Sequence, residues 1–405
     1  MSTESNSIDE HKIAIIGAGP AGLFCSTLLL EKGYQVDLYD QSSGLAKKFL
    51  IAGNGGLNLT HSENIDSFTS KYYENKSLFK ELLSDFSPND LRKFCYKLGV
   101  ETFIGTSGRV FPKKLKAAEM LLNWQKYLNS FSGFRLFKKY KLKEILKDKT
   151  LTFEYLAETK TIKYHQVILA LGGGSWKKTG SDGSWVEYMT SLGIEVAQLK
   201  PMNCGFETNW SEFLKKKKQR LYLKNISIKF GDKSVKAEMV ITNFGIEGTA
   251  VYALSKYIRE ELERNNKALI TIDLKPDLTL EEIKSRFLKK KAKESMSNFL
   301  RRSIKLNKDA ITLLNENKDS ISPELIKDFK VTLNSVRSID EAISTAGGVC
   351  LEGLTPNFES KEVQGLYFCG EMLNYEAPTG GYLLQGCFST AFRVTQNFPD
   401  VTPRK

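Results

Sequence analysis

A strand, a glycine-rich turn and a helix open the chain and restrict its fold more than any other stretch. Residues 13–16 form an uncharged, β-branched run that suits a strand buried on both faces of a parallel sheet. Gly17, Gly19 and Gly22 follow in G-x-G-x-x-G spacing, and residues 23–32 predict a helix. In this arrangement the first glycine allows a sharp turn, the second lets backbone approach a pyrophosphate, and the third lets the helix pack against the strand. The helix start then offers free N–H groups and a positive dipole end to phosphates.

A second predicted strand covers residues 36–40 and ends in an acidic side chain, Asp40. At this distance from the glycines, a carboxylate accepts hydrogen bonds from the ribose diol of a dinucleotide. A tight strand-to-helix turn that binds no nucleotide would not require the carboxylate. The opening stretch therefore predicts a dinucleotide-binding site, with these contacts: Gly17, Ala18, Gly19, Pro20, Ala21, Gly22, Asp40 and Gln41.

The composition is that of a globular protein: the 405 residues are 41% apolar and 26% charged, enough for two or three domains or one large domain with an insertion. The six cysteines form no C-x-x-C pair, and three histidines are too few to predict a metal site. Residues 13–30 carry no charge, but their spaced glycines and proline, and the acidic leader before them, argue against a membrane span or export signal. We therefore expect a cytoplasmic protein with reduced cysteines, no metal and no membrane partner.

The formal net charge of +12 raises the question of a nucleic-acid partner. Basic side chains concentrate in two runs, at residues 215–220 and 289–293. Neither run lies in a nucleic-acid-binding motif or alternates with aromatic residues. We therefore interpret both runs as solvated basic faces, and the sequence does not predict nucleic acid as a partner.

The loop at residues 42–63 is too rich in glycine to predict a regular element. Consecutive backbone N–H groups in such a loop can form an anion-binding concavity, to which Lys47 and Lys48 add positive charge. Because the loop directly follows Asp40, it is expected to lie along the pyrophosphate and ribityl part of a cofactor. The alternative is an ordinary surface loop.

Residues 78–173 are expected to continue the cofactor domain with helices and strands. Helices are expected at residues 78–98, split at a Ser87 cap, and at residues 116–127; short antiparallel strands are expected over 134–165. Residues 167–171 predict another buried strand, which ends in Gly172 and Gly173, where backbone again comes close to a ligand.

From residue 194 the pattern changes, and we expect an inserted region that is part β and part helical. Strands are predicted at 226–230, 237–242 and 268–274, followed by a mainly helical stretch over 280–333 with Thr279 and Ser322 as caps. The predicted domains are residues 1–193 and 347–405, which form the cofactor domain, and residues 194–346, which cover the cofactor and supply a substrate pocket.

The C-terminal region returns to the pattern of the beginning. Residues 365–371 predict a strand that ends in Gly370 and Glu371, and a glycine pair, Gly380 and Gly381, precedes a last helix. The carboxylate of Glu371 can hold a ribityl hydroxyl, and the helix N-terminus can stabilise negative charge on a reduced flavin. A nicotinamide dinucleotide domain alone would not need this return, so the pattern favours FAD.

Several motifs together resemble one family. They are IAIIGAGPAGL at the start, KFLIAGNGGLNLTHSE in the loop, SGRVFP, LALGGGSW with TGSDG, and FCGEML with APTGGYLLQG near the end. These motifs are similar to those of the BaiN/YhiN-like NAD(P)/FAD-dependent oxidoreductases, in particular the branch that carries GGLNLTHSE. The resemblance implies an α/β flavoprotein: a doubly wound, Rossmann-like, glutathione-reductase-type FAD domain with an inserted β-plus-helical substrate domain.

The resemblance also implies which residues contact FAD. Beyond the opening stretch these are Lys48, Gly55, Gly56 and Asn58 along the loop, Gly172 and Gly173 near the adenosine half, Gly370 and Glu371 at the ribityl chain, and Gly380, Gly381, Tyr382 and Leu383 near the flavin ring. Relatives that reduce bile acids carry Arg-Cys-Asn where this chain has Gly56-Leu57-Asn58. The resemblance therefore does not identify the substrate.

The leading hypothesis is an FAD-dependent oxidoreductase that moves a hydride between a small organic substrate and the flavin, with NAD(P)H as the reductant. Because the chain has one dinucleotide fingerprint, NAD(P)H would bind transiently over the flavin. An RNA-directed flavoprotein similar to tRNA modifiers and a non-catalytic flavin-holding protein are the alternatives.

No catalytic residue is assigned from the sequence. His61 can transfer protons near neutral pH, but a structural role is favoured. Arg109 suits either an anionic substrate or an ion pair, and Glu247 either the active site or a turn. Cys369 is expected to be a small buried residue.

Overall fold

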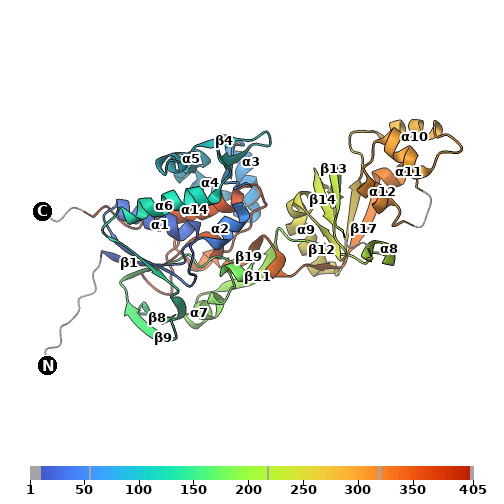
Figure 1. Cartoon of the computed structure of the whole chain (residues 1–405). Helices are drawn as coiled ribbons and strands as arrows, with labels where there is room; N and C mark the ends of the chain where they lie inside the picture. Colours follow the sequence, from blue (N-terminus) through green and yellow to red (C-terminus); the bar gives the residue numbers. More distant parts are fainter. Residues whose placement is uncertain (1–10, 54–55, 217–218, 318–320, 402–405) are drawn as a thin grey trace, which may run out of the picture. The chain divides into compact units, whose positions relative to one another are not determined.

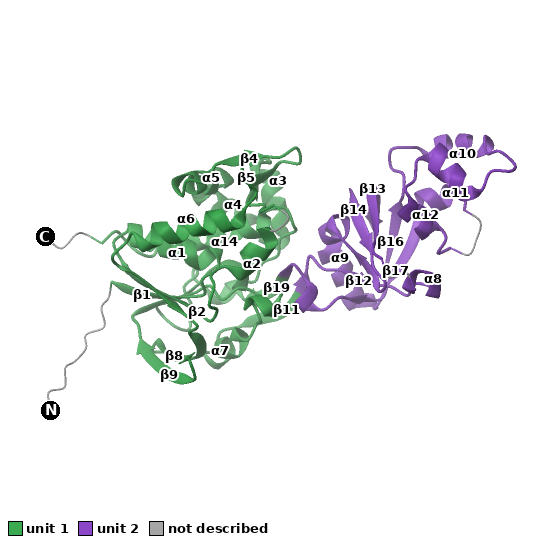
Figure 2. Ribbon diagram, in the orientation of Figure 1, with its two compact units in different colours: residues 1–200, 345–405 green, residues 201–344 purple. Residues whose placement is uncertain are grey.

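The computed structural model describes residues 11–53, 56–216, 219–317 and 321–401 (Figure 1). The chain divides into two compact units: residues 1–200 with 345–405 form unit 1, and residues 201–344 form unit 2 (Figure 2). It leaves unit 1 along β11 (Val196–Met202) and returns along β19 (Ser344–Val349). These two strands pair with each other as a separate two-stranded sheet.

Unit 1 is built on a five-stranded sheet in the order β20-β10-β1-β2-β6, and all its pairings are parallel. The strands are β1 (Lys12–Ile16), β2 (Gln35–Asp40), β6 (Phe134–Lys138), β10 (Gln166–Leu169) and β20 (Leu366–Phe368). Ile13, Ala14 and Ile15 have no exposed surface, as expected for a strand covered on both faces. The Rossmann-like arrangement predicted from the opening stretch is confirmed.

The expectation of an antiparallel meander from residue 134 is wrong at its first strand. β6 pairs in parallel with β2 and extends the main sheet. The antiparallel meander begins one strand later and consists of β7 (Lys141–Ile145), β8 (Thr150–Tyr155) and β9 (Glu158–Lys163). The alternating pattern indicates a strand but does not specify the direction of its partner, which depends on long-range pairing.

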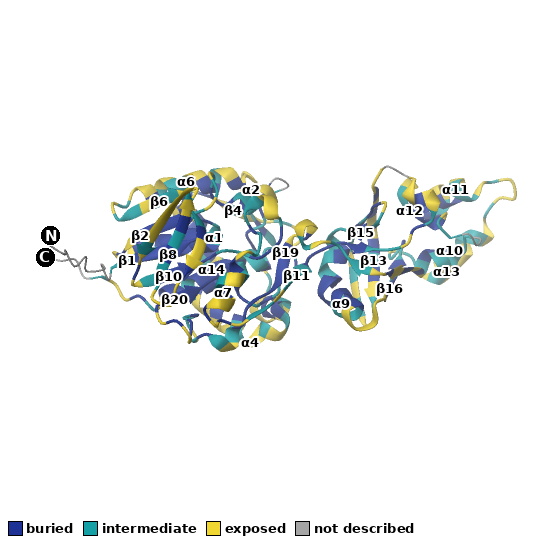
Figure 3. Ribbon diagram, turned by 90° about the horizontal axis from the view of Figure 1, so that it is seen from below, coloured by how far each residue is buried: buried dark blue, intermediate teal, exposed yellow. Residues whose placement is uncertain are grey.

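Helices bury their apolar faces against the parallel sheet, and the buried core runs through the sheet and α1 (Figure 3). The helices of unit 1 are α1 (Pro20–Glu31), α2 (Lys47–Ala52), α3 (Ile65–Thr69), α4 (Lys76–Asp85), α5 (Pro88–Lys97), α6 (Ala117–Asn129), α7 (Trp185–Ser191) and α14 (Tyr382–Thr395). Helix α1 packs on α14, so the first and last helices share one core. Within it the Phe24 ring meets those of Phe86, Phe94 and Phe388 at centroid distances of 4.8–5.0 Å.

Two local details differ in how well the sequence anticipated them. The predicted Ser87 cap is confirmed, because its side chain and that of Asp90 form a reciprocal capping box at the start of α5. By contrast, the loop predicted without regular structure contains α2, whose start at Ala46 has a left-handed φ of 48° and no side-chain cap. The loop then continues into β3 (Thr60–His61), which pairs with β5 (Arg109–Pro112) beside β4 (Thr102–Ile104).

Unit 2 has a seven-stranded antiparallel sheet in the order β17-β16-β13-β14-β15-β12-β18. Its strands are β12 (Phe206–Glu207), β13 (Leu221–Phe230), β14 (Lys233–Ile241), β15 (Gly245–Glu247), β16 (Ala268–Asp273), β17 (Phe329–Leu333) and β18 (Ser335–Val336). Helix α9 (Thr249–Asn265) packs on this sheet, and unit 2 has a hydrophobic core of its own.

The remaining helices of unit 2 are α8 (Glu212–Lys215), α10 (Leu280–Leu288), α11 (Met296–Phe299), α12 (Lys308–Leu314) and α13 (Pro323–Lys327). Thr279 and Ser322 cap α10 and α13 as predicted. The predicted helical stretch over 280–333 is wrong at its end, because Phe329–Leu333 is strand β17 on the edge of the sheet. No helix among the described residues is long and apolar enough to span a bilayer.

Candidate functional site

The glycine turn after β1 has the geometry that its spacing predicted. Gly17 has a φ of 105°, and a Cβ there would lie 2.3 Å from the carbonyl oxygen of Ala170. A Cβ on Gly22 would lie 1.9 Å from the carbonyl oxygen of Gly17, so only glycine lets α1 approach the turn this closely. A Cβ on Gly19 would meet no atom within 4 Å. The backbone at Gly19 is therefore open to a ligand.

This turn forms one wall of a cleft of about 1050 Å³, part of which is open to solvent. The cleft lies where β1, β2, β10 and β20 end at their carboxyl termini, and every lining residue belongs to unit 1. Ligands of open parallel sheets bind outside the carboxyl ends of the strands.

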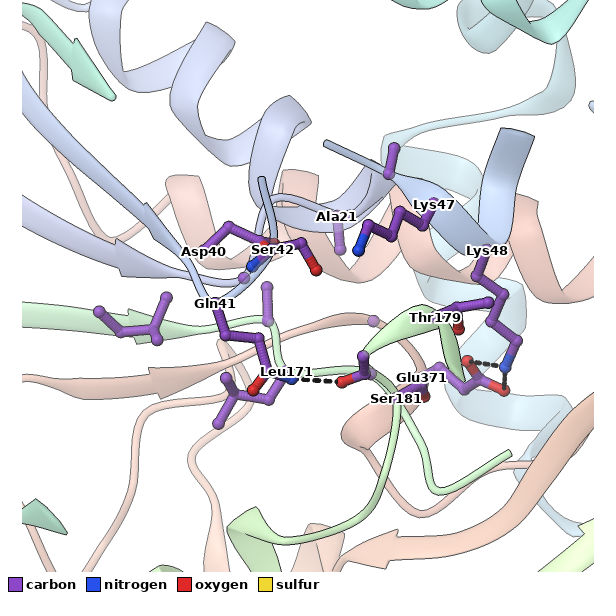
Figure 4. Close-up of a pocket in the computed structure, with 18 of the residues that line it drawn as sticks. Ala21, Asp40, Gln41, Ser42, Lys47, Lys48, Leu171, Thr179, Ser181 and Glu371 are labelled. Carbon is purple, nitrogen blue, oxygen red and sulfur yellow. Dashed lines mark hydrogen bonds and ion pairs between the residues drawn. The ribbon is translucent and has the colours of Figure 1, made fainter. Parts of the chain in front are cut away.

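Asp40 stands at the end of β2 inside the cleft (Figure 4). Its carboxylate accepts hydrogen bonds from the backbone N–H groups of Ala18, at 2.8 Å, and Ser42, at 2.7 Å. It thereby ties the glycine turn to the strand end. Burial raises the pKa of the Asp40 carboxyl above its ordinary value, and these hydrogen bonds oppose that shift.

A charged pair forms the opposite side of the cleft. Lys48, on α2, donates to both carboxylate oxygens of Glu371 at 2.9 Å (Figure 4). It also donates to the hydroxyl of Ser175 at 2.7 Å. The backbone N–H of Thr345 donates to the same carboxylate at 3.1 Å. The Glu371 side chain is 9% exposed. Two segments far apart in the sequence, at Lys48 and Thr345, therefore hold the Glu371 carboxylate in a fixed orientation.

The third side of the cleft is the segment between β10 and α7. The Gln41 side-chain amide donates to the carbonyl of Gly180 at 2.7 Å (Figure 4). The indole N–H of Trp185 donates to the carbonyl of Gly172 at 3.0 Å, and Ser181 donates to that of Gly173 at 2.9 Å. These bonds fix the glycine-rich end of β10 around the cleft.

Half of the residues predicted to contact a cofactor line this cleft: Gly17, Gly19, Pro20, Ala21, Asp40, Gln41, Lys48, Gly172, Gly370 and Glu371. The residues outside its lining are Ala18, Gly22, Gly56, Asn58, Gly173, Gly380, Gly381, Tyr382 and Leu383. Gly55 lies outside the described residues. Contact of each residue with a cofactor stays a prediction.

The start of α14 is packed against β3 rather than open to the cleft. Gly381 has a φ of 92°, and a Cβ there would lie 2.6 Å from Cα of Thr60. The Tyr382 hydroxyl donates to Glu63 at 2.5 Å, and its ring stacks on His61 with centroids 5.5 Å apart. The last helix therefore fixes the end of the glycine-rich loop.

Two acceptor atoms in this loop fit a ligand that donates hydrogen bonds. Asn58 Oδ1 and Thr60 Oγ1 are buried, and neither has a hydrogen-bond partner in the described part of the chain. Leaving such a group unsatisfied costs about 1–3 kcal/mol. Neither Asn58 nor Thr60 lines the cleft, so the fit of the cleft to FAD rests on the open backbone at Gly19 and on the strand-end carboxylates.

Three of the other sequence candidates, His61, Glu247 and Cys369, have structural partners. His61 Nε2 donates to the carbonyl of Ser107 at 2.9 Å, while Nδ1 accepts from the N–H of Glu63 at 3.2 Å; this pairing assigns the neutral tautomer. Glu247 pairs with Arg220 in unit 2 at 3.1 Å. Cys369 lines the cleft with its sulfur 3.7 Å from that of Cys25 and forms no disulfide. Contact with Cys25 and burial raise the pKa of the Cys369 thiol.

Several lining residues were missed from the sequence. Tyr140 directly precedes β7, Leu142 lies in β7, and Tyr188 comes from α7. Thr179 and Ser181 lie in the TGSDG motif, which marked the segment but not its position beside the cleft. No signal in the sequence placed the meander beside the carboxyl end of β2.

Comparison with known proteins agrees with this geometry. The model of the family described as "HI0933-like protein Rossmann domain" matches residues 11–397. The chain belongs to this family. It is 28% identical over 411 residues to a 3-dehydro-bile acid delta(4,6)-reductase of Clostridium scindens, covering 94% of this chain and 97% of the relative. It is 23% identical to a ribosomal RNA dihydrouridine synthase of Haemophilus influenzae, covering 93% and 96%.

Among solved structures, the 3-ketosteroid delta1-dehydrogenase from Sterolibacterium denitrificans aligns over 96% of this chain and 99% of its own, with a TM-score of 0.55 and 9% identity. At this identity the likeness shows the fold alone. Family and fold together support an FAD-dependent redox enzyme, as the resemblance implied. This HI0933-like protein thus has a Rossmann-like FAD-binding unit whose cleft contains both predicted carboxylates.

Proposed function

We propose that this HI0933-like protein transfers a hydride between a small organic substrate and bound FAD, with NAD(P)H as the reductant. One observation supports the proposal most strongly. A single cleft contains the glycine turn with Asp40 from the start of the chain and the Lys48–Glu371 pair that involves its end. A cofactor as long as FAD, with a nucleotide half and a flavin half, uses both sides of such a cleft.

Each side of the cleft has a distinct binding role in this proposal. The glycine turn and the start of α1 bind the pyrophosphate, and Asp40 accepts from the adenosine ribose. Glu371 accepts from the ribityl chain, while Lys48 and the N–H of Thr345 fix its orientation. The flavin ring, when bound, supplies the centre that accepts and returns a hydride.

In this proposal the electron donor, NAD(P)H, has no dinucleotide-binding fingerprint of its own. The sequence contains one G-x-G-x-x-G fingerprint in the required strand-turn-helix context. NAD(P)H would therefore meet the flavin at a transient site, which it leaves after the transfer. Substrate would then occupy the same side of the flavin.

Purification of the full chain tests the proposal. We expect a yellow protein that releases FAD on denaturation, and anaerobic stopped-flow mixing with NADH or NADPH should bleach the flavin absorbance. A colourless chain that takes up neither FAD nor FMN would contradict the cofactor assignment, as would release of FMN. Retained FAD that neither nicotinamide reduces would favour the non-catalytic alternative.

A second candidate is an RNA-directed flavoenzyme. It is favoured by the ribosomal RNA dihydrouridine synthase name of a relative that matches 93% of this chain. Reduction of deproteinised ribosomal RNA by the purified chain with NADPH, followed by mass spectrometry of nucleosides, tests it. Dihydrouridine formed with the enzyme but not without it would support RNA as the substrate, and its absence under conditions that reduce the flavin would exclude this candidate.

A further inference from the structure

One segment of unit 2 concentrates the positive charge of the protein. Residues 284–308, here called the basic lobe, contain ten lysines and arginines and one acidic residue, Glu294. The rest of unit 2 contains 18 basic and 19 acidic residues and is close to neutral. The like charges of this +9 segment repel one another. An ordinary solvated surface, by contrast, mixes charges of both signs.

The basic lobe is folded, so its charges are held on a defined backbone. It includes the end of α10, all of α11 and the π-helical turn Leu300–Ile304. Phe299 and Leu300 are fully buried, and the Phe287 ring packs edge-on against Phe299 at 4.9 Å. The Arg286 guanidinium donates to the carbonyl of Ser303 at 2.7 Å.

Most cations of the lobe lack an acidic partner. Glu294 pairs with Arg302 at 2.8 Å, and Lys284 pairs with Glu324 at 3.0 Å. Lys289, Lys290, Lys293, Arg301 and Lys305 form no salt bridge with any described residue, and all but Lys290, which is half-buried, are exposed. The solvent-facing positions of α10 and α11 show as exposed surface (Figure 3). These cations are available to an anionic partner.

The surroundings of these cations select the kind of anion. Leu288, 89% exposed, is the one large apolar side chain exposed in this segment, and Phe287 faces inward, so no apolar face exists to enter a membrane. Protein interfaces are depleted of lysine at their centres, which disfavours an acidic protein partner. Within the lobe itself no aromatic ring is exposed, so residues 284–308 offer no stacking platform for unpaired bases; the nearest exposed ring is that of Tyr222, on β13. What remains is contact with a regular array of phosphates.

We propose that the basic lobe binds the phosphate backbone of double-stranded RNA, independently of base sequence. Lysine ammonium groups contact phosphate oxygens as point charges and release bound counterions. Duplex RNA is recognised mainly through its shape and backbone because its major groove is too narrow to read. The names of the relatives do not say which part of the chain would contact RNA. The inference also does not depend on the redox chemistry of unit 1.

The test compares two variants of the intact protein that lose the same charge from the same unit. K289Q/K290Q/K293Q removes three unpaired lysines of the lobe, and K216Q/K229Q/K267Q removes three exposed lysines elsewhere in unit 2. Binding to a labelled ribosomal RNA hairpin is measured by anisotropy from 50 to 400 mM KCl. Each phosphate contact contributes a slope of about −0.7 to −0.9 to log K against log[salt].

For the lobe variant we expect a slope shallower by about 2–3 and an affinity lower on the order of 100-fold at 0.1 M salt, because three contacts are lost. The control variant should bind as the unchanged protein does. Equal losses in both variants, or none in the lobe variant, would overturn the proposal. So would a loss of binding to phosphatidylglycerol vesicles without a loss for RNA.

Flavin content separates this inference from the proposed function. Both variants should retain FAD and its rate of reduction by nicotinamide, because every residue that lines the FAD cleft belongs to unit 1. A chain that binds RNA through the lobe but contains no flavin would contradict the proposed function alone. A chain that is yellow and reducible but binds RNA equally well without the three lysines would contradict this inference alone.

Discussion

At the scale of single residues, Asp40 has two tasks. Its carboxylate accepts two backbone N–H groups that shape the glycine turn, and it faces the cleft where a ribose is proposed to bind. Burial raises the pKa of this carboxyl, so the charged form is disfavoured in the free protein. In the unfolded chain this carboxyl ionises near its ordinary pKa of 3.8, whereas in the folded chain it keeps its proton to a higher pH. The unfolding free energy therefore falls as pH rises from about 3.8 through the raised pKa.

The pH dependence of FAD binding is the first prediction. Ribose hydroxyls that donate to Asp40 favour its charged form, so FAD affinity should rise with pH from about 4 through the raised pKa. In Asp40→Asn this dependence should flatten, with affinity lower by about 1.5–3 kcal/mol for each charge-assisted bond lost. Titration of the apoprotein by flavin fluorescence between pH 4 and 7 measures both. An unchanged affinity in the variant would mean that Asp40 serves the turn alone.

The Lys48–Glu371 pair gives the second prediction. Glu371→Gln leaves the Lys48 ammonium without its counter-charge, and Lys48→Met leaves a carboxylate that is 9% exposed. Because Lys48 is itself 24% exposed, each single change should cost about 1–3 kcal/mol of unfolding free energy, less than for a fully buried pair. The double variant should cost less than the two singles added together, and chemical denaturation of all three proteins measures the difference. Additive costs would show that the two side chains do not interact.

At the scale of elements, helix caps are the most local feature and the most accessible to sequence reasoning. Ser87 before Pro88 and Thr279 three residues before Glu282 were identifiable because a capping box needs only neighbouring residues, and both form. Helix α2 could not be identified in this way, since it begins at a left-handed Ala46 and has no side-chain cap. The parallel pairing of β6 and the strand β17 depend on partners far away in the chain.

The same distinction explains the site. Gly17, Asp40, Gly172 and Glu371 were predictable because each follows a recognisable buried strand, and parallel strands end at one edge of a sheet. Tyr140 lines the cleft because the meander passes beside β2, which no local pattern reveals.

The third prediction concerns the α5 cap. Ser87→Ala removes the acceptor for the N–H of Asp90 and should lower the unfolding free energy of unit 1 by about 1 kcal/mol. Ser84→Ala is the matched control, because its exposed hydroxyl bonds only to a carbonyl of its own helix, and its effect should stay within about 0.5 kcal/mol. Urea denaturation followed by circular dichroism compares the two. Equal effects would show that the capping box contributes nothing beyond a surface hydroxyl.

At the scale of the whole molecule, the described residues form two hydrophobic cores, one in each compact unit. All residues that line the proposed FAD cleft belong to unit 1, whereas the capping box of α10 belongs to unit 2. A ligand stabilises the folded state of the unit that binds it.

The fourth prediction is that the two units respond separately in calorimetry. FAD at 100 times its Kd should stabilise unit 1 by about 2.7 kcal/mol and move one thermal transition upward by several degrees. Thr279→Ala should lower the other transition and leave the FAD-sensitive one in place. A single transition that responds to both changes would mean that the units unfold as one.

The discontinuity of unit 1 also has a consequence during protein synthesis. Strand β10 lies between β1 and β20, so one of its edges has no partner until residues 366–368 leave the ribosome. The 144 residues of unit 2 are translated in between, which takes roughly 7–30 s at about 5–20 residues per second. During this time the edge of β10 that will pair with β20 has no partner in the nascent sheet. The speed of translation through residues 201–344 thus sets how long that edge stays open to pairing with another chain.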